Sequence, residues 1–311
     1  ASVTTVTGSE IAVSSGGAAT LSTAAPTLGT AVVAGPFTLA ARGPLAQKAG
    51  TIVQATTLDI TGAGGAITLA NAGNDVGTLT VRNGGGGVSY RDLNELKLDT
   101  VVAGSVRFDV GAPIVSGPAL SQTPAGSITA TSLAITSSAR GVQLSNAGND
   151  VDSLTVSNPG RLVTFTDKDD LAIAGLSASN VTLAAGGNLT QTGVITASLL
   201  TINATAGDVS LPLAVNDVDT LSVTNPGRGL TFTDVDDLAI GALAAGSMRL
   251  TVGGNLSQGG AITGNSLAVT ASAGTVTLPN SGNNVASATI SNGSRTVSYT
   301  NAGSLAIGGL T

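Results

Sequence analysis

The residues best suited to chemistry are acidic, and they form two short segments of similar sequence. Asp167-Lys168-Asp169-Asp170 recurs 67 positions later as Asp234-Val235-Asp236-Asp237. Carboxylate oxygens are the ligands that Ca²⁺ prefers, and the ion takes six to eight oxygens. Six aspartates are therefore candidate calcium ligands, and calcium is the one cofactor that the sequence suggests: Asp167, Asp169, Asp170, Asp234, Asp236 and Asp237.

A second interpretation of these segments is structural. Neither matches an EF-hand loop or a Gly-Gly-x-Gly-x-Asp nonapeptide, and the corresponding segment near the end of the chain is Asn301-Ala302-Gly303-Ser304. Asp and Asn side chains commonly accept hydrogen bonds from their own backbone in turns. We favour solvated turns and keep calcium binding as the alternative.

Four asparagines mark another recurring turn: Asn83, Asn158, Asn225 and Asn292, the last three followed three positions later by Arg161, Arg228 and Arg295. Asn followed by Gly or by Pro-Gly is a strong turn signal. We expect a turn with inward Asn hydrogen bonds rather than a binding site. Asn-x-Ser/Thr triplets begin at Asn180, Asn188, Asn203, Asn255 and Asn292, but such triplets arise by chance in a chain this rich in Ser and Thr.

The amino-acid composition excludes most other kinds of catalytic or metal site. The 311 residues include no Cys, His or Trp, which excludes disulfides, thiolate nucleophiles, Ser-His-Asp triads and Cys/His zinc sites. Polysaccharide-active β-helix enzymes need carboxylates and a base gathered in one groove. The one irregular stretch, from Asp109 to Pro118, brings one Asp and no base. Regular Thr-x-Thr rows, which ice binding requires, are missing. We therefore expect no enzymatic activity.

The net charge and the hydropathy of the chain limit the kinds of partner that it can bind. The net charge of -6 argues against nucleic acid, and 2% aromatic residues leave little for base stacking. Mean hydropathy is +0.38, yet no apolar run approaches the roughly 20 residues of a membrane helix. We expect neither a nucleic-acid partner nor a membrane span.

Internal repeats organise the whole chain. Asn74-Asp75-Val76 returns at Asn149, Asn216 and Asn283, at spacings of 75, 67 and 67. The first interval is longer mainly because six residues are inserted near Pro113. We predict one continuous array over 1–311, with repeats at about 1–47 (partial), 48–122, 123–191, 192–258 and 259–311 (partial).

Each repeat contains about eight short apolar–polar–apolar triplets, of which Val209-Ser210-Leu211 is one. Alternation of period two over short runs, with Thr at many central positions, is typical of half-buried strands. Gly, Asn, Asp and Pro separate the triplets, and no helical periodicity occurs over ten or more residues. A propeller would need longer strands and aromatic signatures, whereas a parallel solenoid suits short strands with small aliphatic cores. We predict an all-β, single-stranded parallel β-helix (β-solenoid) of about 67-residue repeats, with either three coils of about 22 residues or four of about 17 in each.

Gly186-Gly187-Asn188-Leu189-Thr190-Gln191 and Gly253-Gly254-Asn255-Leu256-Ser257-Gln258 resemble the repeats of filamentous-haemagglutinin-type proteins. The resemblance covers roughly residues 37–311. It implies a right-handed β-helix in a secreted bacterial adhesin or exoprotein at the cell surface or in the extracellular matrix. The partners it implies are host or neighbouring cell surfaces, or matrix polysaccharide. It leaves open whether the chain is a segment of a large adhesin exported by two-partner secretion.

Both ends of the sequence look strand-like, with no helix, charge cluster or proline to cap them. An uncovered coil exposes unpaired backbone groups that can pair with another chain. We therefore expect copies to stack head to tail into a filament, through an assembly surface that includes Val3, Val6, Leu305, Ile307 and Leu310.

Overall fold

A computed structural model describes residues 2–6, 10–24, 27–111, 117–137 and 140–311, and the side chains from Glu10 onward within these ranges. Every regular element in them is a β-strand. The strands pair in parallel and stack as coils, so the chain is an all-β parallel solenoid, as the sequence predicts. The chain forms two compact units, 1–165 and 166–311.

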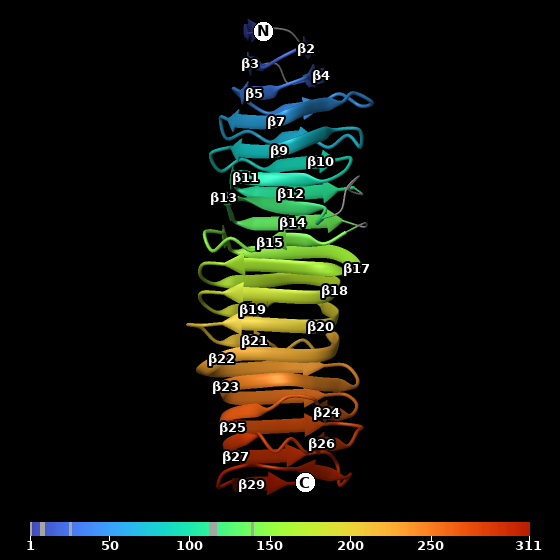
Figure 1. Ribbon diagram of the computed structural model, residues 1–311, viewed down its shortest axis with the longest axis vertical. Helices are drawn as coiled ribbons and strands as arrows, with labels where there is room; N and C mark the ends of the chain where they lie inside the picture. The colour runs from blue at the N-terminus through green and yellow to red at the C-terminus, as the bar shows by residue number, and fades with distance from the viewer. Residues whose placement is uncertain (1, 7–9, 25–26, 112–116, 138–139) are drawn as a thin grey trace. The chain divides into compact units, whose positions relative to one another are not determined.

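The first unit contains strands β1 to β17, the last of which runs past the boundary (Figure 1). They are β1 (Ser2–Val6), β2 (Ile11–Ser15), β3 (Ala19–Thr23), β4 (Thr27–Val33), β5 (Pro36–Ala41), β6 (Leu45–Gln47), β7 (Val53–Gly62), β8 (Ile67–Leu69), β9 (Asp75–Arg82), β10 (Val88–Asp92), β11 (Leu96–Val102), β12 (Ser105–Val110), β13 (Leu120–Ala130), β14 (Ser132–Ser137), β15 (Val142–Leu144), β16 (Asp150–Val151) and β17 (Ser153–Asp167).

The second unit contains β18 (Leu171–Ala185), β19 (Leu189–Gln191), β20 (Ile195–Ala204), β21 (Val209–Leu211), β22 (Asp217–Asp234), β23 (Leu238–Val252), β24 (Leu256–Gln258), β25 (Ile262–Ala271), β26 (Val276–Leu278), β27 (Asn284–Ser291), β28 (Val297–Tyr299) and β29 (Ala306–Leu310). The longest of these strands bend around corners of the coil, so one strand contributes to more than one face.

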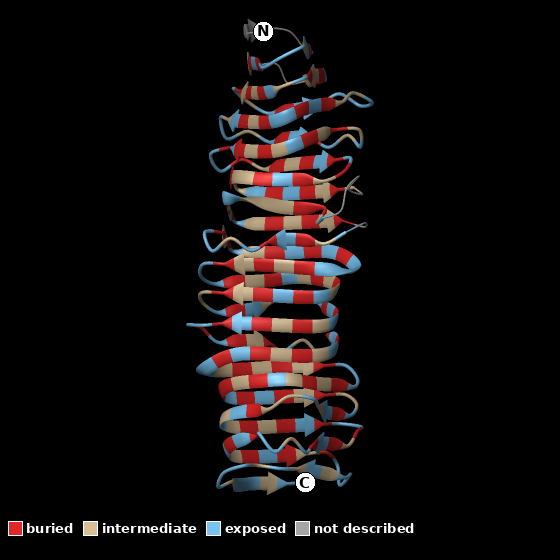
Figure 2. Cartoon of the chain, in the orientation of Figure 1, coloured by how far each residue is buried: buried red, intermediate tan, exposed pale blue. Residues whose placement is uncertain are grey.

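Buried residues alternate with more exposed ones along nearly every strand (Figure 2). In β20, Leu200 and Ile202 are buried while Asn203 is exposed. Apolar side chains fill most of the interior between coils, which explains the alternation. Five of the six aromatic side chains are buried, and Tyr90 pairs with Phe108 of the next coil in the ladder.

Straight stretches, here called strand segments, each bring one or two inward side chains to a face. From Val163 to the residue before Leu230, one repeat has ten. They begin at Val163, Leu171, Leu176, Val181, Leu189, Ile195, Leu200, Val209, Val218 and Leu221. The sequence predicts about eight segments per repeat; the two additional ones are that at Val218 and that at Leu176, which recurs as Leu243. Each of these contributes little more than one large apolar side chain.

Each segment pairs with the third segment after it, so a coil has three faces. One column runs from Leu171 through Leu189 and Val209 to Leu230 in the second unit. These steps are 18, 20 and 21 residues, so the coil matches neither spacing that the sequence left open.

The sequence repeat and the coil are therefore out of phase. Leu238 is the repeat equivalent of Leu171, but it lies eight residues beyond Leu230 and heads a different column, which continues to Leu256 and Val276. In the first unit, Val88 leads through Val106 and Leu133 to Leu154, while its equivalent Val163 pairs with Val142. Because three segments complete one coil, the ten segments of a repeat make three full coils and occupy one further face. Each repeat is thus turned by about a third of a coil relative to the one before it.

Candidate functional site

The acidic segments divide into buried and exposed aspartates. Asp167 and Asp234 are 2% exposed, whereas Asp169, Asp170, Asp236 and Asp237 lie at the surface. The backbone amides of Asp169 and Asp236 donate to Asp167 and Asp234, so these residues do cap their own turns. The expectation that the turns are solvated is wrong for Asp167 and Asp234, because both side chains point into the solenoid.

The exposed members link one coil to the next. Asp237 accepts a hydrogen bond at 2.6 Å from the backbone amide of Asn255, and Asp170 accepts the same bond from Asn188. The backbone amide and the side chain of Asn255 hold the pKa of Asp237 below its ordinary value. These contacts satisfy the backbone where the chain leaves the ladder.

Asp234 is the most unusual of the six. One carboxyl oxygen accepts from the amide of Val218 at 3.0 Å, and the other lies 3.5 Å from the amide of Asp236. Burial, reinforced by the charges of Asp236 and Asp217, raises its pKa to about 7 in spite of these two donors.

Asp92 occupies the same place two repeats before Asp234, and it was not among the site residues predicted from the sequence. It accepts from the amides of Val76 and Asn94 at 3.1 Å each and from the Tyr90 hydroxyl at 2.9 Å. Burial raises its pKa to about 6, and its three donors limit the rise.

Asn301 takes this position in the last repeat. Its Oδ1 accepts from the amide of Val285 at 3.0 Å, as Asp234 does from Val218. Its Nδ2 donates to the carbonyl oxygens of Val285 and Gly303. The site therefore holds a neutral side chain that both donates and accepts.

A pair of amide side chains lies next to each buried Asp or Asn. Asn216 is fully buried, and its Oδ1 accepts from the Gln191 side chain and, at 3.0 Å, from the Ile195 amide. Its Nδ2 donates to Gln191 Oε1 and to the carbonyls of Leu211 and Thr233. All hydrogen-bonding groups of this buried amide are satisfied.

The same pair occurs in each repeat: Gln47 with Asn74, Gln122 with Asn149, Gln191 with Asn216 and Gln258 with Asn283. With the carboxyl or amide that follows, each pair forms what we call a polar stack; the third of the four stacks consists of Gln191, Asn216 and Asp234. The recurrence of both Gln and Asn is visible in the sequence, but their contact depends on a coil length that the sequence left open.

The second asparagine series is also buried. Asn225 Nδ2 donates to the carbonyl of Gly229, closing the turn that Pro226 and Gly227 form, and Asn158 does the same with Leu162. Gly227 has φ +76, a left-handed conformation that suits glycine. The predicted inward hydrogen bonds are confirmed. The Oδ1 atoms of Asn158 and Asn225 are buried without a partner.

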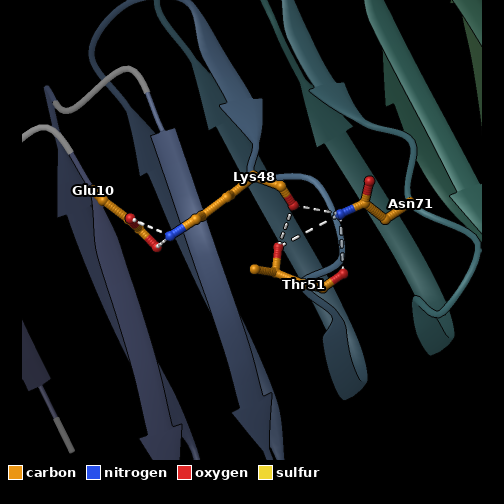
Figure 3. A network of polar contacts seen from close by, with 4 residues as sticks. All are labelled: Glu10, Lys48, Thr51 and Asn71. Atoms are coloured by element: carbon orange, nitrogen blue, oxygen red, sulfur yellow. Dashed lines mark hydrogen bonds and ion pairs between the residues drawn. The ribbon is translucent and has the colours of Figure 1, made fainter.

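An additional network surrounds the corner after β6 in the first unit (Figure 3). Asn71 Nδ2 donates to the carbonyls of Lys48 and Thr51, and Thr51 Oγ1 donates to the same Lys48 carbonyl. The Lys48 ammonium pairs with Glu10 at 2.9 Å. Both ionic side chains are about half exposed, so this pair contributes little to stability.

The remaining candidates are spread over the surface. Within the described residues no three acidic side chains lie close enough together to hold a metal ion. A hollow of about 300 Å³ crosses β8, β10, β12 and β14, and Arg107 is its one charged lining residue. Its described lining residues include no carboxylate. Much of the stretch from Asp109 to Pro118 lies outside the described residues.

The residues expected at an assembly surface lie in the first and last strands or beside them. Val3 and Val6 belong to β1, whose side chains are outside the described part of the structure. Ile307 and Leu310, in β29, are 63% and 61% exposed, and Leu305 is half-buried. Stacking between copies remains a prediction.

In the described part of the chain, no helix has the length and apolar character needed to cross a membrane. No curated protein and no solved structure matches the sequence. A family model described as "Repeats of unknown function (DUF5649)" matches four successive stretches, 16–83, 85–158, 160–225 and 227–292. Each stretch ends at one of the four recurring asparagines of the Asn225 series. The matches cover most of the chain, which therefore belongs to this family of repeats.

Proposed function

We propose that these repeats are the structural region of a secreted bacterial protein that works at the cell surface or in the extracellular matrix. In this role the solenoid forms or spaces an adhesive fibre and catalyses no reaction. Its partners are copies of itself, and cell surfaces or matrix polysaccharide. The resemblance to filamentous-haemagglutinin-type repeats supports the bacterial and extracellular part of the proposal.

The relation between repeat and coil is the observation on which this proposal depends. The polar stack returns in all four repeats, and within each unit successive stacks are displaced by one face. A protein that binds a ligand along one flat face needs the same side chains on that face in every coil. Here equivalent surface residues of successive repeats lie on different faces of the solenoid. This arrangement suits a scaffold whose faces have similar surfaces.

Surface chemistry gives further support. Outward residues along β20, such as Thr201 and Asn203, are short and uncharged. The sequence has 30 charged residues among 311, and no His or Cys that could serve as a base or a thiol nucleophile. What all four repeats share is instead buried and serves to join coils.

A replacement experiment in cells that produce the protein tests the structural role. One strain lacks residues 48–258, and another carries in their place an unrelated β-solenoid with the same number of coils. We expect deletion to abolish adhesion and replacement to restore it. If the replacement fails although its product reaches the surface in equal amount, the repeats have a specific binding role and the proposal is wrong.

Location and assembly need separate measurements. Antibodies against the repeats should label intact cells, and labelling only after permeabilisation would contradict an extracellular role. Head-to-tail stacking predicts filaments by electron microscopy and a concentration-dependent mass by light scattering. A chain that stays monomeric at high concentration would refute stacking while leaving the scaffold role in place.

A further inference from the structure

The corner of the coil at Asp234 has a property that a purely structural role does not require. Its carboxyl is 2% exposed and makes no ion pair with Lys or Arg in the described part of the chain. The charged side chains near it are Asp217, at the start of β22, and Asp236, in the following turn. Gln191 and Asn216, beneath it in the polar stack, are neutral. An ionised carboxylate here would be buried among like charges, which is unfavourable.

We propose that this corner is a pH-operated latch between two coils. With Asp234 protonated, the coil of Asn216 and Val218 is held firmly to the next coil; with Asp234 ionised, the corner loosens.

Asn301 shows how the closed form satisfies its hydrogen bonds. There Nδ2 donates to the carbonyls of Val285 and Gly303, while Oδ1 accepts from the Val285 amide. The equivalent carbonyls near Asp234 are those of Val218 and Asp236. A protonated carboxyl has one O–H donor and an acceptor oxygen, so it can donate to one of these carbonyls while its other oxygen accepts from the Val218 amide. An ionised carboxyl only accepts, and it adds a third negative charge beside Asp217 and Asp236.

Hydrogen-bond donors lower the pKa of the buried carboxyl, whereas burial and acidic neighbours raise it. The balance between these effects differs between Asp92 and Asp234 in the direction that this mechanism requires. Asp92 has three donors, including the Tyr90 hydroxyl, and Asn94 takes the place of the second acidic neighbour. Asp234 has one short donor contact, one long one and two acidic neighbours. The order of the two pKa values, about 6 and about 7, agrees with this difference. The latch at Asp234 therefore works nearer to neutral pH than a latch at Asp92 would.

Hydrogen exchange followed by mass spectrometry on the 311-residue chain tests the latch. After correction for intrinsic exchange rates, peptides containing the Val218 and Val235 amides should lose at least tenfold in protection between pH 5.5 and pH 8. Peptides around Val285, where Asn301 cannot ionise, should keep their protection and serve as an internal reference.

Two variants separate the latch from general stability effects. Asp234→Asn copies the natural residue of the last repeat and should make protection at Val218 independent of pH. Asp219→Asn, at an exposed position of the same strand, should leave the wild-type pH dependence intact. The proposal fails if the wild-type chain shows no pH dependence at Val218, or if Asp234→Asn retains it. It also fails if the Val285 peptides change as much as those of Val218.

Discussion

Replacing Asn216 by alanine should destabilise the solenoid strongly, although the residue lies on no catalytic or binding surface. The substitution leaves the Ile195 amide, the Thr233 carbonyl and the Gln191 side chain without their buried partner. Each unsatisfied buried group costs about 1–3 kcal/mol. Because the Gln191 amide can reorient and water can enter the space, we expect a loss of about 4 kcal/mol in the free energy of unfolding.

Urea unfolding followed by circular dichroism measures this loss, and hydrogen exchange locates it. A repeat array behaves as a chain of neighbouring units, so the opening should concentrate in the coils beginning at Leu189 and Val209. Asn203→Ala, which removes an exposed amide from β20, is the matched control and should change stability by less than about 0.5 kcal/mol.

A double-mutant cycle tests the pairing itself. Once Asn216 is alanine, replacing Gln191 by alanine should cost far less than it does in the wild-type chain, because the two side chains share their hydrogen bonds. Additive effects, or an Asn216→Ala loss below about 1 kcal/mol, would refute the view that the polar stacks join the coils.

Three further predictions test the core, the corners and the buried carboxyls. Leu200→Asp places a charge in the dry interior and should cost several kcal/mol in urea unfolding, whereas Thr201→Asp, one residue on, should be nearly silent; equal losses would contradict the inward–outward assignment. Gly253→Ala should raise the proportion of unfolded chain at a given urea concentration, because its Cβ would collide with the Val235 carbonyl oxygen, while Gly43→Ala, whose Cβ would meet nothing, should not. Asp92 binds its proton more tightly folded (pKa about 6) than unfolded (3.8), so its contribution is complete below about pH 4 and is lost as pH rises through 6. Asp92→Asn should therefore remove up to about 3 kcal/mol of pH-dependent stability between pH 4 and 8, and an unchanged pH profile of thermal unfolding would argue against a buried, protonated carboxyl.

The fold could be predicted from the sequence because its cause is local. Alternation such as Val209-Ser210-Leu211 specifies a half-buried strand wherever it occurs, and Asn225-Pro226-Gly227 specifies a turn. The number of coils per repeat could not be predicted, because segments with a single large apolar residue, such as that at Val218, give too weak an alternation to count.

The site was predicted less well, and for a related reason. Asp234 and Asp236 look alike in the sequence, yet one is buried and the other exposed. Their difference arises from where the corner falls relative to the coil below, which is set by pairing across about 20 residues rather than by neighbours. The same dependence on coil length hid the contact between Gln191 and Asn216.

The offset between repeat and coil also affects how such a protein can change in length. At about 4.8 Å per coil, one repeat advances the solenoid by about 16 Å and turns it by about one third. Gain or loss of a single repeat by recombination would thus rotate the part of the protein that follows it to another side of the solenoid axis. Only a change of three repeats restores the original direction, so repeat number sets orientation as well as reach.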